Sequence, residues 1–447
     1  MNRTSAFRLV PRHPARFLAL ALAALGSPAP LCSQPPVLVG IDVVDFEHYR
    51  RLNKTKIGLF ASSAARNRHG QSTLDALRRA KNLQVVALFR VEFGGPGETA
   101  RAAADERIAA EAKVRVHVVT PDLQSIDPAW LEGCNALVYD VPDTGSRWQP
   151  QADVLRLALR TAYGTGMRLQ VLDRPNPLGA AKVGGPIADP APEGAPRSSG
   201  LPVLHGMTIA ELAYYYNENE EINADLRLAH TRNWERDQPF AGTDLFWSAP
   251  VDGVDSASKA WLYATLGMLE TTNVSLGMHT GLPYEVIGAP WVDGRRLTRH
   301  LQNAAIPGLT FVARRFVPRA GPFAGQACQG VQLAVTNGPE LDPVLAALHI
   351  ACGLRDLHGG KWQVDAMAPR LQNAAILAGL KAGKTPSELA EIWLPTLKGF
   401  AKVGSAFSLY TGGKGEPGAP AVPDTDKTDP APAPQGPPAT TKPGGGG

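Results

Sequence analysis

Three acidic residues each follow a short apolar segment in the first half of the chain. Glu92 comes after the segment 83–89, Asp140 after 136–139 and Asp173 after 168–172. If these segments are parallel strands, their carboxyl ends meet at one edge of a sheet, where open α/β proteins bind ligands. Carboxyl groups gathered there can protonate a leaving oxygen and activate water in glycosyl transfer. They can instead hold a divalent metal or cap the helices that follow.

The residues after Glu92 and Asp140 fit a binding site. Glycines at positions 94, 95 and 97 allow the backbone to approach a ligand closely. The string Asp140-Val-Pro-Asp-Thr-Gly-Ser-Arg147 ends in a guanidinium group, which can bind a carboxylate through two parallel hydrogen bonds. Arg147 can alternatively brace its own loop through Asp140 or Asp143. The first alternative predicts that Arg147 binds substrate.

Two further strings place polar side chains near the same edge. The run 173–179 holds Asn176 between two prolines, which fix φ and stiffen the loop. Such a loop can present the Asn176 amide to a sugar, or it can be a plain crossover connection. His205 stands three residues before Thr208, at the start of a predicted helix. It can act as an acid, base or hydrogen-bond donor, or be a buried structural histidine.

The second half of the chain has one rich polar stretch, 270–280, which contains Glu270 and Asn273. An aromatic-bearing segment that includes Trp291 follows it. This combination is typical of a sugar-binding wall, with Trp291 either stacked on a pyranose ring or buried in the core. Glu270 is then a candidate second carboxylate, and Asn273 a candidate substrate ligand.

These residues need a scaffold, and the first half predicts a parallel sheet covered on both faces, because apolar strands alternate with helices. No Gly-x-Gly-x-x-Gly string follows the first strand, so a dinucleotide site is not supported. Thr208 and Glu211 form a capping-box pattern. The second half is less regular and predicts a smaller α+β domain. The predicted strands are 56–60, 83–89, 114–119, 136–139, 168–172, 309–317 and 331–336, and the predicted helices are 73–80, 102–112, 154–163, 208–216, 259–269, 341–351 and 386–392.

Both ends of the chain differ from its body. Residues 1–33 combine four arginines with a short apolar run, which is typical of a signal peptide, and no later segment has 18 uninterrupted apolar residues. Residues 412–447 are rich in Gly and Pro and predict a disordered tail. The sequence therefore predicts an exported protein, periplasmic or secreted, without a membrane span in its mature form. The two domains are expected at 36–246 and 247–411.

Composition excludes some classes of function. The 447 residues carry a formal net charge of +4, and no Lys/Arg run interleaves with aromatic residues, so a nucleic-acid partner is not expected. The four cysteines form no Cys-x-x-Cys string or zinc spacing, so no structural metal is expected. Cys328 and Cys352 are equally compatible with a disulfide and with two buried thiols.

Taken together, the strings resemble the exo-β-N-acetylmuramidases, a family once known only as a domain of unknown function. The resemblance runs in family order from about residue 37 to residue 402. It is carried by 40–42, 57–59, 73–75, Glu92 with Gly94, 140–147, 173–179, 205–208, 233–236, 270–273 and 288–291.

This resemblance implies a Rossmann-like N-terminal domain, a smaller C-terminal domain and a cleft between them. It implies release of terminal N-acetylmuramic acid from muropeptides or glycan ends, without a metal or nucleotide cofactor. The family's glutamate falls on Glu92, as general acid or nucleophile, with Asp140 and Glu270 as further catalytic candidates. The implied substrate ligands are Arg147, Asp173, Asn176, His205, Asn273 and Trp291.

The chain also departs from the family pattern. Phe93 replaces a histidine, Pro142 a glutamine and Met278 an arginine, and the strings 61–64 and 148–151 differ as well. Each lost donor removes an interaction of the kind that stabilises a transition state. Two hypotheses follow: a glycoside hydrolase, or a muropeptide-binding envelope protein with little turnover on the same fold.

Overall fold

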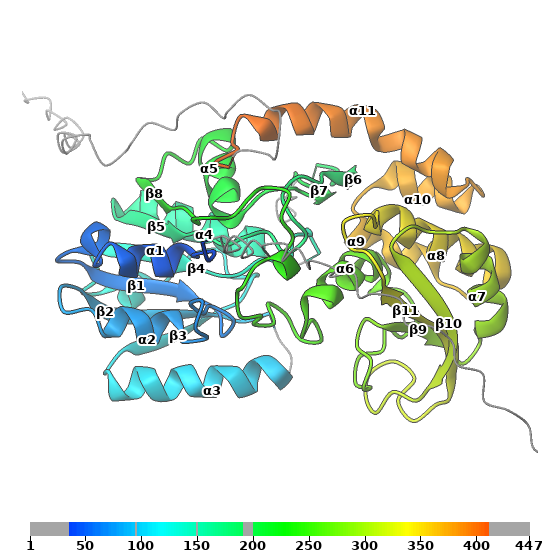
Figure 1. Cartoon of the computed structure of the whole chain (residues 1–447), viewed down its shortest axis with the longest axis horizontal. Helices are drawn as coiled ribbons and strands as arrows, with labels where there is room; N and C mark the ends of the chain where they lie inside the picture. The colour runs from blue at the N-terminus through cyan, green and yellow to red at the C-terminus, as the bar shows by residue number, and fades with distance from the viewer. Residues whose placement is uncertain (1–34, 94–95, 149–150, 191–199, 411–447) are drawn as a thin grey trace, which may run out of the picture. The chain divides into compact units, whose positions relative to one another are not determined.

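The computed structural model describes residues 35–93, 96–148, 151–190 and 200–410 (Figure 1). The predicted signal peptide and the predicted tail lie outside these residues, as do Gly94 and Gly95. None of the helices in the described ranges is long and apolar enough to span a bilayer.

The first domain is built on a six-stranded sheet with the order β3-β2-β1-β4-β5-β8. Every neighbouring pair in it is parallel. Its strands are β1 (Lys56–Ala61), β2 (Gln84–Val91), β3 (Arg115–Val119), β4 (Ala136–Asp140), β5 (Arg168–Leu172) and β8 (Leu226–Ala229). This sheet confirms the α/β fold class with a Rossmann-like first domain.

Helices cover both faces of this sheet because its strands are apolar on both sides. Along β1, Ile57 and Leu59 pack in one cluster and Phe60 in another, which is the alternation expected of a strand. The first cluster includes residues of α1 (Gly40–Phe46), α2 (Thr73–Arg78) and α3 (Pro96–Glu111). The second includes residues of α4 (Gln151–Thr165) and α5 (Ile209–Asn219).

The second domain has a three-stranded antiparallel sheet in the order β10-β11-β9. The strands are β9 (Val286–Ala289), β10 (Leu309–Phe316) and β11 (Cys328–Val335), and the helices are α6 (Ala257–Leu266), α7 (Gly294–Asn303), α8 (Pro343–His358), α9 (Ala368–Leu371), α10 (Ala374–Lys381) and α11 (Pro386–Ser405). A two-stranded sheet, β6 (Gly184–Ile187) with β7 (Pro202–Leu204), precedes it. The 3-10 turns are η1 (Arg50–Leu52), η2 (Pro128–Leu131), η3 (Phe240–Gly242), η4 (Gly267–Leu269) and η5 (Val364–Met367). The smaller α+β domain is thereby confirmed.

Helix α11 contacts the cores of both domains. Its first half contributes Leu389 and Trp393 to the core that surrounds the antiparallel sheet. Its second half contributes Phe400 to the core beneath α4 and α5. The chain then continues to Tyr410, which packs edge-on against Trp234 of the first domain. The last described segment therefore returns to the domain in which the chain began.

Candidate active site

The connections of the parallel sheet reverse direction between two neighbouring strands. From β1 the chain moves outward to β2 and β3, whereas β4, β5 and β8 extend the sheet on the other side. A crevice forms outside the carboxyl ends of the strands at such a reversal. Ala61 at the end of β1 pairs with Arg90 on one side and Asp140 on the other. The sheet therefore fixes Arg90 and Asp140 about 10 Å apart, at two strand spacings.

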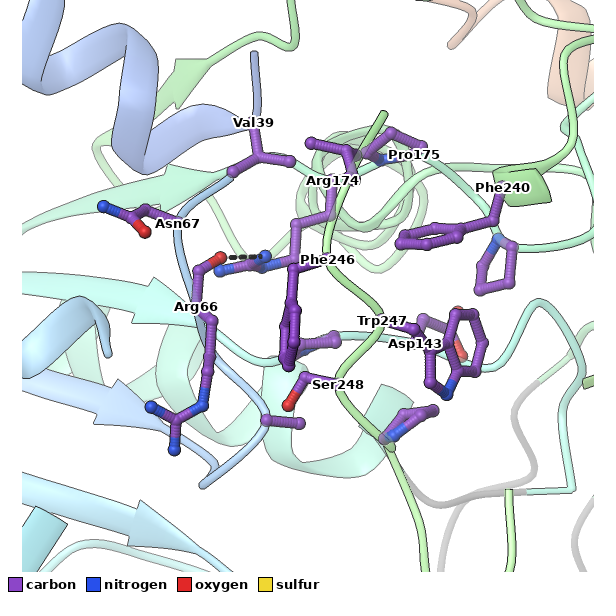
Figure 2. A pocket seen from close by; sticks show the side chains of 15 residues that line it. Val39, Arg66, Asn67, Asp143, Arg174, Pro175, Phe240, Phe246, Trp247 and Ser248 are labelled. Carbon is purple, nitrogen blue, oxygen red and sulfur yellow. Dashed lines mark hydrogen bonds between the residues drawn. The ribbon is translucent and has the colours of Figure 1, made fainter. Parts of the chain in front are cut away.

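A cleft of about 510 Å³, partly open to solvent, lies at this edge. Its lining comes from the loops after β1, β4 and β5 and from the segment 240–250 (Figure 2). The lining residues are Val39, Ala64, Arg66, Asn67, Pro142, Asp143, Arg174, Pro175, Pro177, Phe240, Leu245, Phe246, Trp247, Ser248 and Pro250. The resemblance implies a cleft between the two domains, but this lining comes from the first domain and the junction that follows it.

Three aromatic side chains line the cleft. The rings of Phe240 and Trp247 meet edge to face with their centroids 4.8 Å apart. The indole N–H of Trp247 donates to the carbonyl oxygen of Val254 at 3.0 Å, which fixes that ring. Phe246 is 59% exposed although it is a large apolar residue, and it stands beside Arg174 in Figure 2. These aromatic rings were not among the predicted site residues.

Asp140 is at the predicted edge, but it does not face the cleft. Its side chain is fully buried, and both of its oxygens accept hydrogen bonds from the Arg174 guanidinium, at 2.5 and 2.8 Å. The hydroxyl of Thr73 donates to the same carboxylate at 2.5 Å. These contacts favour a structural role for Asp140, which orients Arg174 along the cleft wall.

Asp173 is also buried, and it organises the start of α5. Its carboxylate accepts hydrogen bonds from the Thr208 hydroxyl and the Ala210 N–H, both at 2.9 Å, and from the Tyr410 hydroxyl. Burial raises the pKa of Asp173 to about 7, against the effect of these donors. The capping box of Thr208 and Glu211 is present as predicted. Asp173 thus has the contacts of a helix cap rather than those of a sugar ligand.

Glu92 directly follows β2, at the same edge of the sheet. Its carboxylate accepts a hydrogen bond from Arg90 at 2.7 Å, and its side chain is 30% exposed. Arg90 also pairs with Glu106 of α3. Of the three strand-end acids, Glu92 alone keeps substantial exposure. Its neighbour Phe93, at the family's histidine position, packs against the cores of both domains.

The loop after β4 presents Asp143 to the cleft. The Nε2 atom of His205 lies 2.9 Å from Asp143 Oδ2. His205 itself is only 2% exposed and is absent from the cleft lining, so it lies behind Asp143 instead of contacting a ligand. Asn176 is buried too, because its amide donates to the Met207 carbonyl at 2.9 Å and accepts from the Leu178 N–H. The direct substrate contacts predicted for His205 and Asn176 are not supported by these positions.

Arg147 makes neither of the loop contacts considered from the sequence. Its guanidinium donates to the Leu371 carbonyl at 2.6 Å and to the Gln372 side chain at 3.1 Å. Burial lowers the pKa of Arg147 to about 10. It therefore connects the loop after β4 to the end of α9, and it binds a carbonyl and an amide where a carboxylate was expected.

The predicted site residues of the second domain do not line the cleft. Glu270 pairs with Arg370, which also donates to the Trp148 carbonyl, and accepts from the Tyr284 hydroxyl at 3.2 Å. The two amide atoms of Asn273 bond to the backbone of Lys361 and Gln363, each at 2.8 Å. Trp291 packs on the core and edge-on against His358.

The cysteines and the metal-binding side chains give no further site. Cys328 and Cys352 are both buried and both free, which answers the question that their spacing left open. Within the described ranges, His, Cys, Asp and Glu side chains do not gather in groups of three or more that would suit a metal ion.

Comparison with known proteins fits this architecture. The model of the N-terminal domain of exo-β-N-acetylmuramidase NamZ matches residues 57–257, and the model of its C-terminal domain matches 261–410. The peptidoglycan β-N-acetylmuramidase NamZ of Bacillus subtilis (strain 168) is 29% identical over 383 residues, which are 84% of this chain and 92% of that protein.

Two solved structures share the fold. Both are DUF1343 family proteins of Bacteroides fragilis that are 21% identical to this chain, with TM-scores of 0.75 and 0.66. The matches cover 84% and 85% of this chain and 99% and 100% of those chains. With both family models matched in order along one continuous two-domain fold, the chain belongs to the exo-β-N-acetylmuramidase NamZ family.

Proposed function

We propose that this protein is a glycoside hydrolase that removes terminal N-acetylmuramic acid from peptidoglycan fragments, in the cleft at the carboxyl ends of β1 and β4. The observation that carries the proposal is the lining of this cleft. It combines three aromatic rings, of which Phe246 is 59% exposed, with the carboxylate of Asp143 at the reversal point of the sheet. The family membership supplies the class of substrate.

This lining suits a sugar for two physical reasons. The C–H faces of a pyranose ring are apolar and pack on aromatic rings such as Phe246, while its hydroxyls need hydrogen-bond partners. Asp143 offers such a partner in the same cleft.

We retain Glu92 as the proposed general acid or nucleophile. It lies at the same edge of the sheet as the cleft, outside the residues that line it, and its side chain is 30% exposed. Arg90 holds the carboxylate from one side. Glu270 remains a proposed carboxylate of the second domain, where Arg370 and Tyr284 fix its orientation.

Chromogenic N-acetylmuramide hydrolysis tests the catalytic assignment. We expect para-nitrophenol release by the wild type and a loss of about 10²- to 10⁴-fold in Glu92→Gln, the usual contribution of one acid/base group. Glu106→Gln is the matched control, because Glu106 pairs with the same arginine but is 53% exposed on α3. Full activity of Glu92→Gln would remove Glu92 from the mechanism.

Product analysis tests the exo-acting mode. On glycan chains with a terminal N-acetylmuramic acid, the monosaccharide should be the first and only small product. Appearance of mid-sized oligosaccharides at early times would instead indicate internal cleavage.

The second candidate function is binding of muropeptides with little turnover. It is favoured by the enclosure of Asp140 and Asp173 and by Phe93, which packs in the core where the family has an ionisable histidine. In that case calorimetry should detect N-acetylmuramic acid binding by a wild-type protein that releases no product from any of these substrates.

We also propose that the protein is exported and acts in the periplasm or outside the cell. The support is the arginine-rich start and short apolar run within residues 1–33. N-terminal sequencing of the protein from the producing cell should find a chain that begins near residue 34. A mature protein that retains residues 1–33 in the cytoplasmic fraction would contradict this proposal.

A further inference from the structure

Asp143 is the carboxylate of the cleft itself. Among the described residues that line the cleft, no other carries a carboxyl group. Arg174 and Phe246, which also line the cleft, come from two other segments of the chain, so three segments contribute to the lining around it (Figure 2). Its own side chain is 11% exposed, which leaves a narrow surface toward that space.

The carboxylate of Asp143 is held in one orientation. Its Oδ1 atom accepts from the backbone N–H groups of Thr144 at 2.6 Å and Gly145 at 3.4 Å. Gly145 has a φ of 81°, and a Cβ at that position would collide with the Asn176 amide oxygen, so this turn requires glycine. The turn that aims Asp143 is therefore built into the sequence Asp143-Thr-Gly.

His205 holds the other oxygen from behind. Its Nδ1 atom accepts the Met207 N–H at 3.2 Å, so the neutral imidazole carries its proton on Nε2. That Nε2–H points at Asp143 Oδ2, 2.9 Å away. A carboxylate offers about four lone-pair directions, and these three donors leave one for a ligand.

We propose that Asp143 contacts the substrate of this cleft by accepting a hydrogen bond from a sugar hydroxyl or acetamido N–H, and that His205 is its positioning residue. The proposal rests on the proposed function, because it names the group that recognises the sugar. Asp143 takes the recognition role that the sequence assigned to Asp173, and His205 acts through Asp143 without contacting the sugar.

The first experiment measures both binding and turnover. Calorimetric titration with N-acetylmuramic acid and hydrolysis of the chromogenic N-acetylmuramide are compared for wild type, Asp143→Asn and Asp225→Asn. Asp225 precedes β8 at the opposite edge of the sheet and is half exposed, so its variant should behave as wild type. We expect Asp143→Asn to weaken binding and to lower kcat/KM by tenfold or more.

The second experiment addresses His205 by rescue. The side-chain amide of Gln can place an N–H donor near the position of His Nε2, whereas Ala cannot. At equal Tm, His205→Ala should lower kcat/KM and sugar affinity at least fivefold, and His205→Gln should restore most of the loss. If His205 is purely structural, kcat/KM and sugar affinity in the two variants should change only as far as their thermal stability changes.

The outcomes separate this inference from the function. Turnover by the wild type together with unchanged affinity and kcat/KM in Asp143→Asn overturns the inference and leaves the function intact. If the wild type binds the sugar without turnover and Asp143→Asn weakens that binding, the inference is supported and the hydrolase is refuted. Absence of both binding and turnover in the wild type refutes both. Asp143→Glu gives a second variant that keeps the charge, and it should bind more weakly because the longer side chain loses the fixed geometry.

Discussion

Asp140 and Arg174 show how a residue that suggests chemistry can serve structure. The fully buried carboxylate bonds to two nitrogens of the guanidinium, and Thr73 adds a third donor. Removal of one member of such a pair leaves an uncompensated buried charge and costs about 3–5 kcal/mol. We therefore expect Asp140→Asn to lower the free energy of unfolding by about that amount, as measured by urea unfolding. Its activity should fall in proportion to the folded fraction.

Asp225→Asn is the matched control for this prediction. Asp225 pairs with Arg227 in a half-exposed position, so its loss should change stability by less than about 1 kcal/mol. If Asp140→Asn unfolds like the wild type and yet loses turnover, Asp140 belongs to the chemistry after all.

Phe246 is the opposite case, because it contributes little to stability and leaves an apolar surface exposed in the cleft. Because it is 59% exposed in the cleft wall, truncation removes little buried area. We expect Phe246→Ala to leave the Tm within about 2 °C of wild type and to weaken N-acetylmuramic acid binding by about 1 kcal/mol, or fivefold. Titration calorimetry measures this change. Phe46→Ala, at a 67% exposed position on α1 outside the cleft lining, should bind the sugar as wild type does.

The sequence predicted acidic residues at one edge of the sheet, but not the residues that line the cleft there. Strand-end acids were predicted from local patterns, and Glu92 and Asp140 do share one edge. Which carboxylate stays available depends on partners far away in the sequence, such as Arg174 for Asp140 and Tyr410 for Asp173. No spacing reveals such partners. Asp143 and the three aromatic rings line the cleft but were not predicted as site residues, although the Asp-Thr-Gly turn and the adjacent Phe246 and Trp247 are visible in the sequence.

At the scale of elements, the start of α5 contains a titrating group. The pKa of Asp173 is raised by burial from the ordinary 3.8 to about 7. Between those values the folded chain binds a proton that the unfolded chain releases, so stability is greatest at the acidic end and is lost as the pH rises toward 7. We expect the Tm to fall between pH 5 and pH 8, and Asp173→Asn to show a smaller fall. Differential scanning fluorimetry across this range measures both.

Comparison of the slopes of Tm against pH for the wild type and Asp173→Asn separates the contribution of Asp173 from those of the other titrating groups, which both proteins share. Asp225→Asn should reproduce the wild-type slope, since that aspartate is half exposed. Parallel slopes for wild type and Asp173→Asn would mean that Asp173 stays ionised in the folded protein.

The elements themselves were largely predictable where the hydrophobic pattern is local. Strand β5 has the predicted bounds, and β1, β3 and β4 differ by one residue. Helix α1 was missed because seven residues are too few to show the helical repeat of apolar positions. Helix α11 extends 13 residues past its predicted end despite Pro395. Tertiary packing explains that extension, because the additional turns carry Phe400 into the core of the first domain.

At the scale of the whole molecule, the segment after α11 connects the end of the described chain to its first domain. Phe407 packs edge-on against Tyr214 and Tyr215, with ring centroids 5.2 and 5.3 Å away. The Leu409 N–H donates to the buried Glu211 carboxylate at 2.8 Å, and Tyr410 donates to Asp173 while it accepts from the Thr231 N–H. These contacts satisfy two buried carboxylates of the α5 N-terminus from outside its own domain.

A truncation pair tests this connection. Two chains are compared, one ending at residue 410 and the other at residue 405. The free energy of unfolding of the shorter chain should be lower by about 4 kcal/mol, because aromatic surface becomes exposed and buried carboxylates lose hydrogen-bond donors. Tyr410→Phe in the longer chain removes the hydroxyl alone and should lower the free energy of unfolding by about 1–3 kcal/mol. Urea unfolding followed by tryptophan fluorescence measures each step. Since α11 packs in both cores, loss of the segment should also weaken the coupling of the two domains, so that the shorter chain unfolds in two transitions where the longer unfolds in one. Equal midpoints for both chains would mean that α5 keeps its N-terminal structure without residues 406–410.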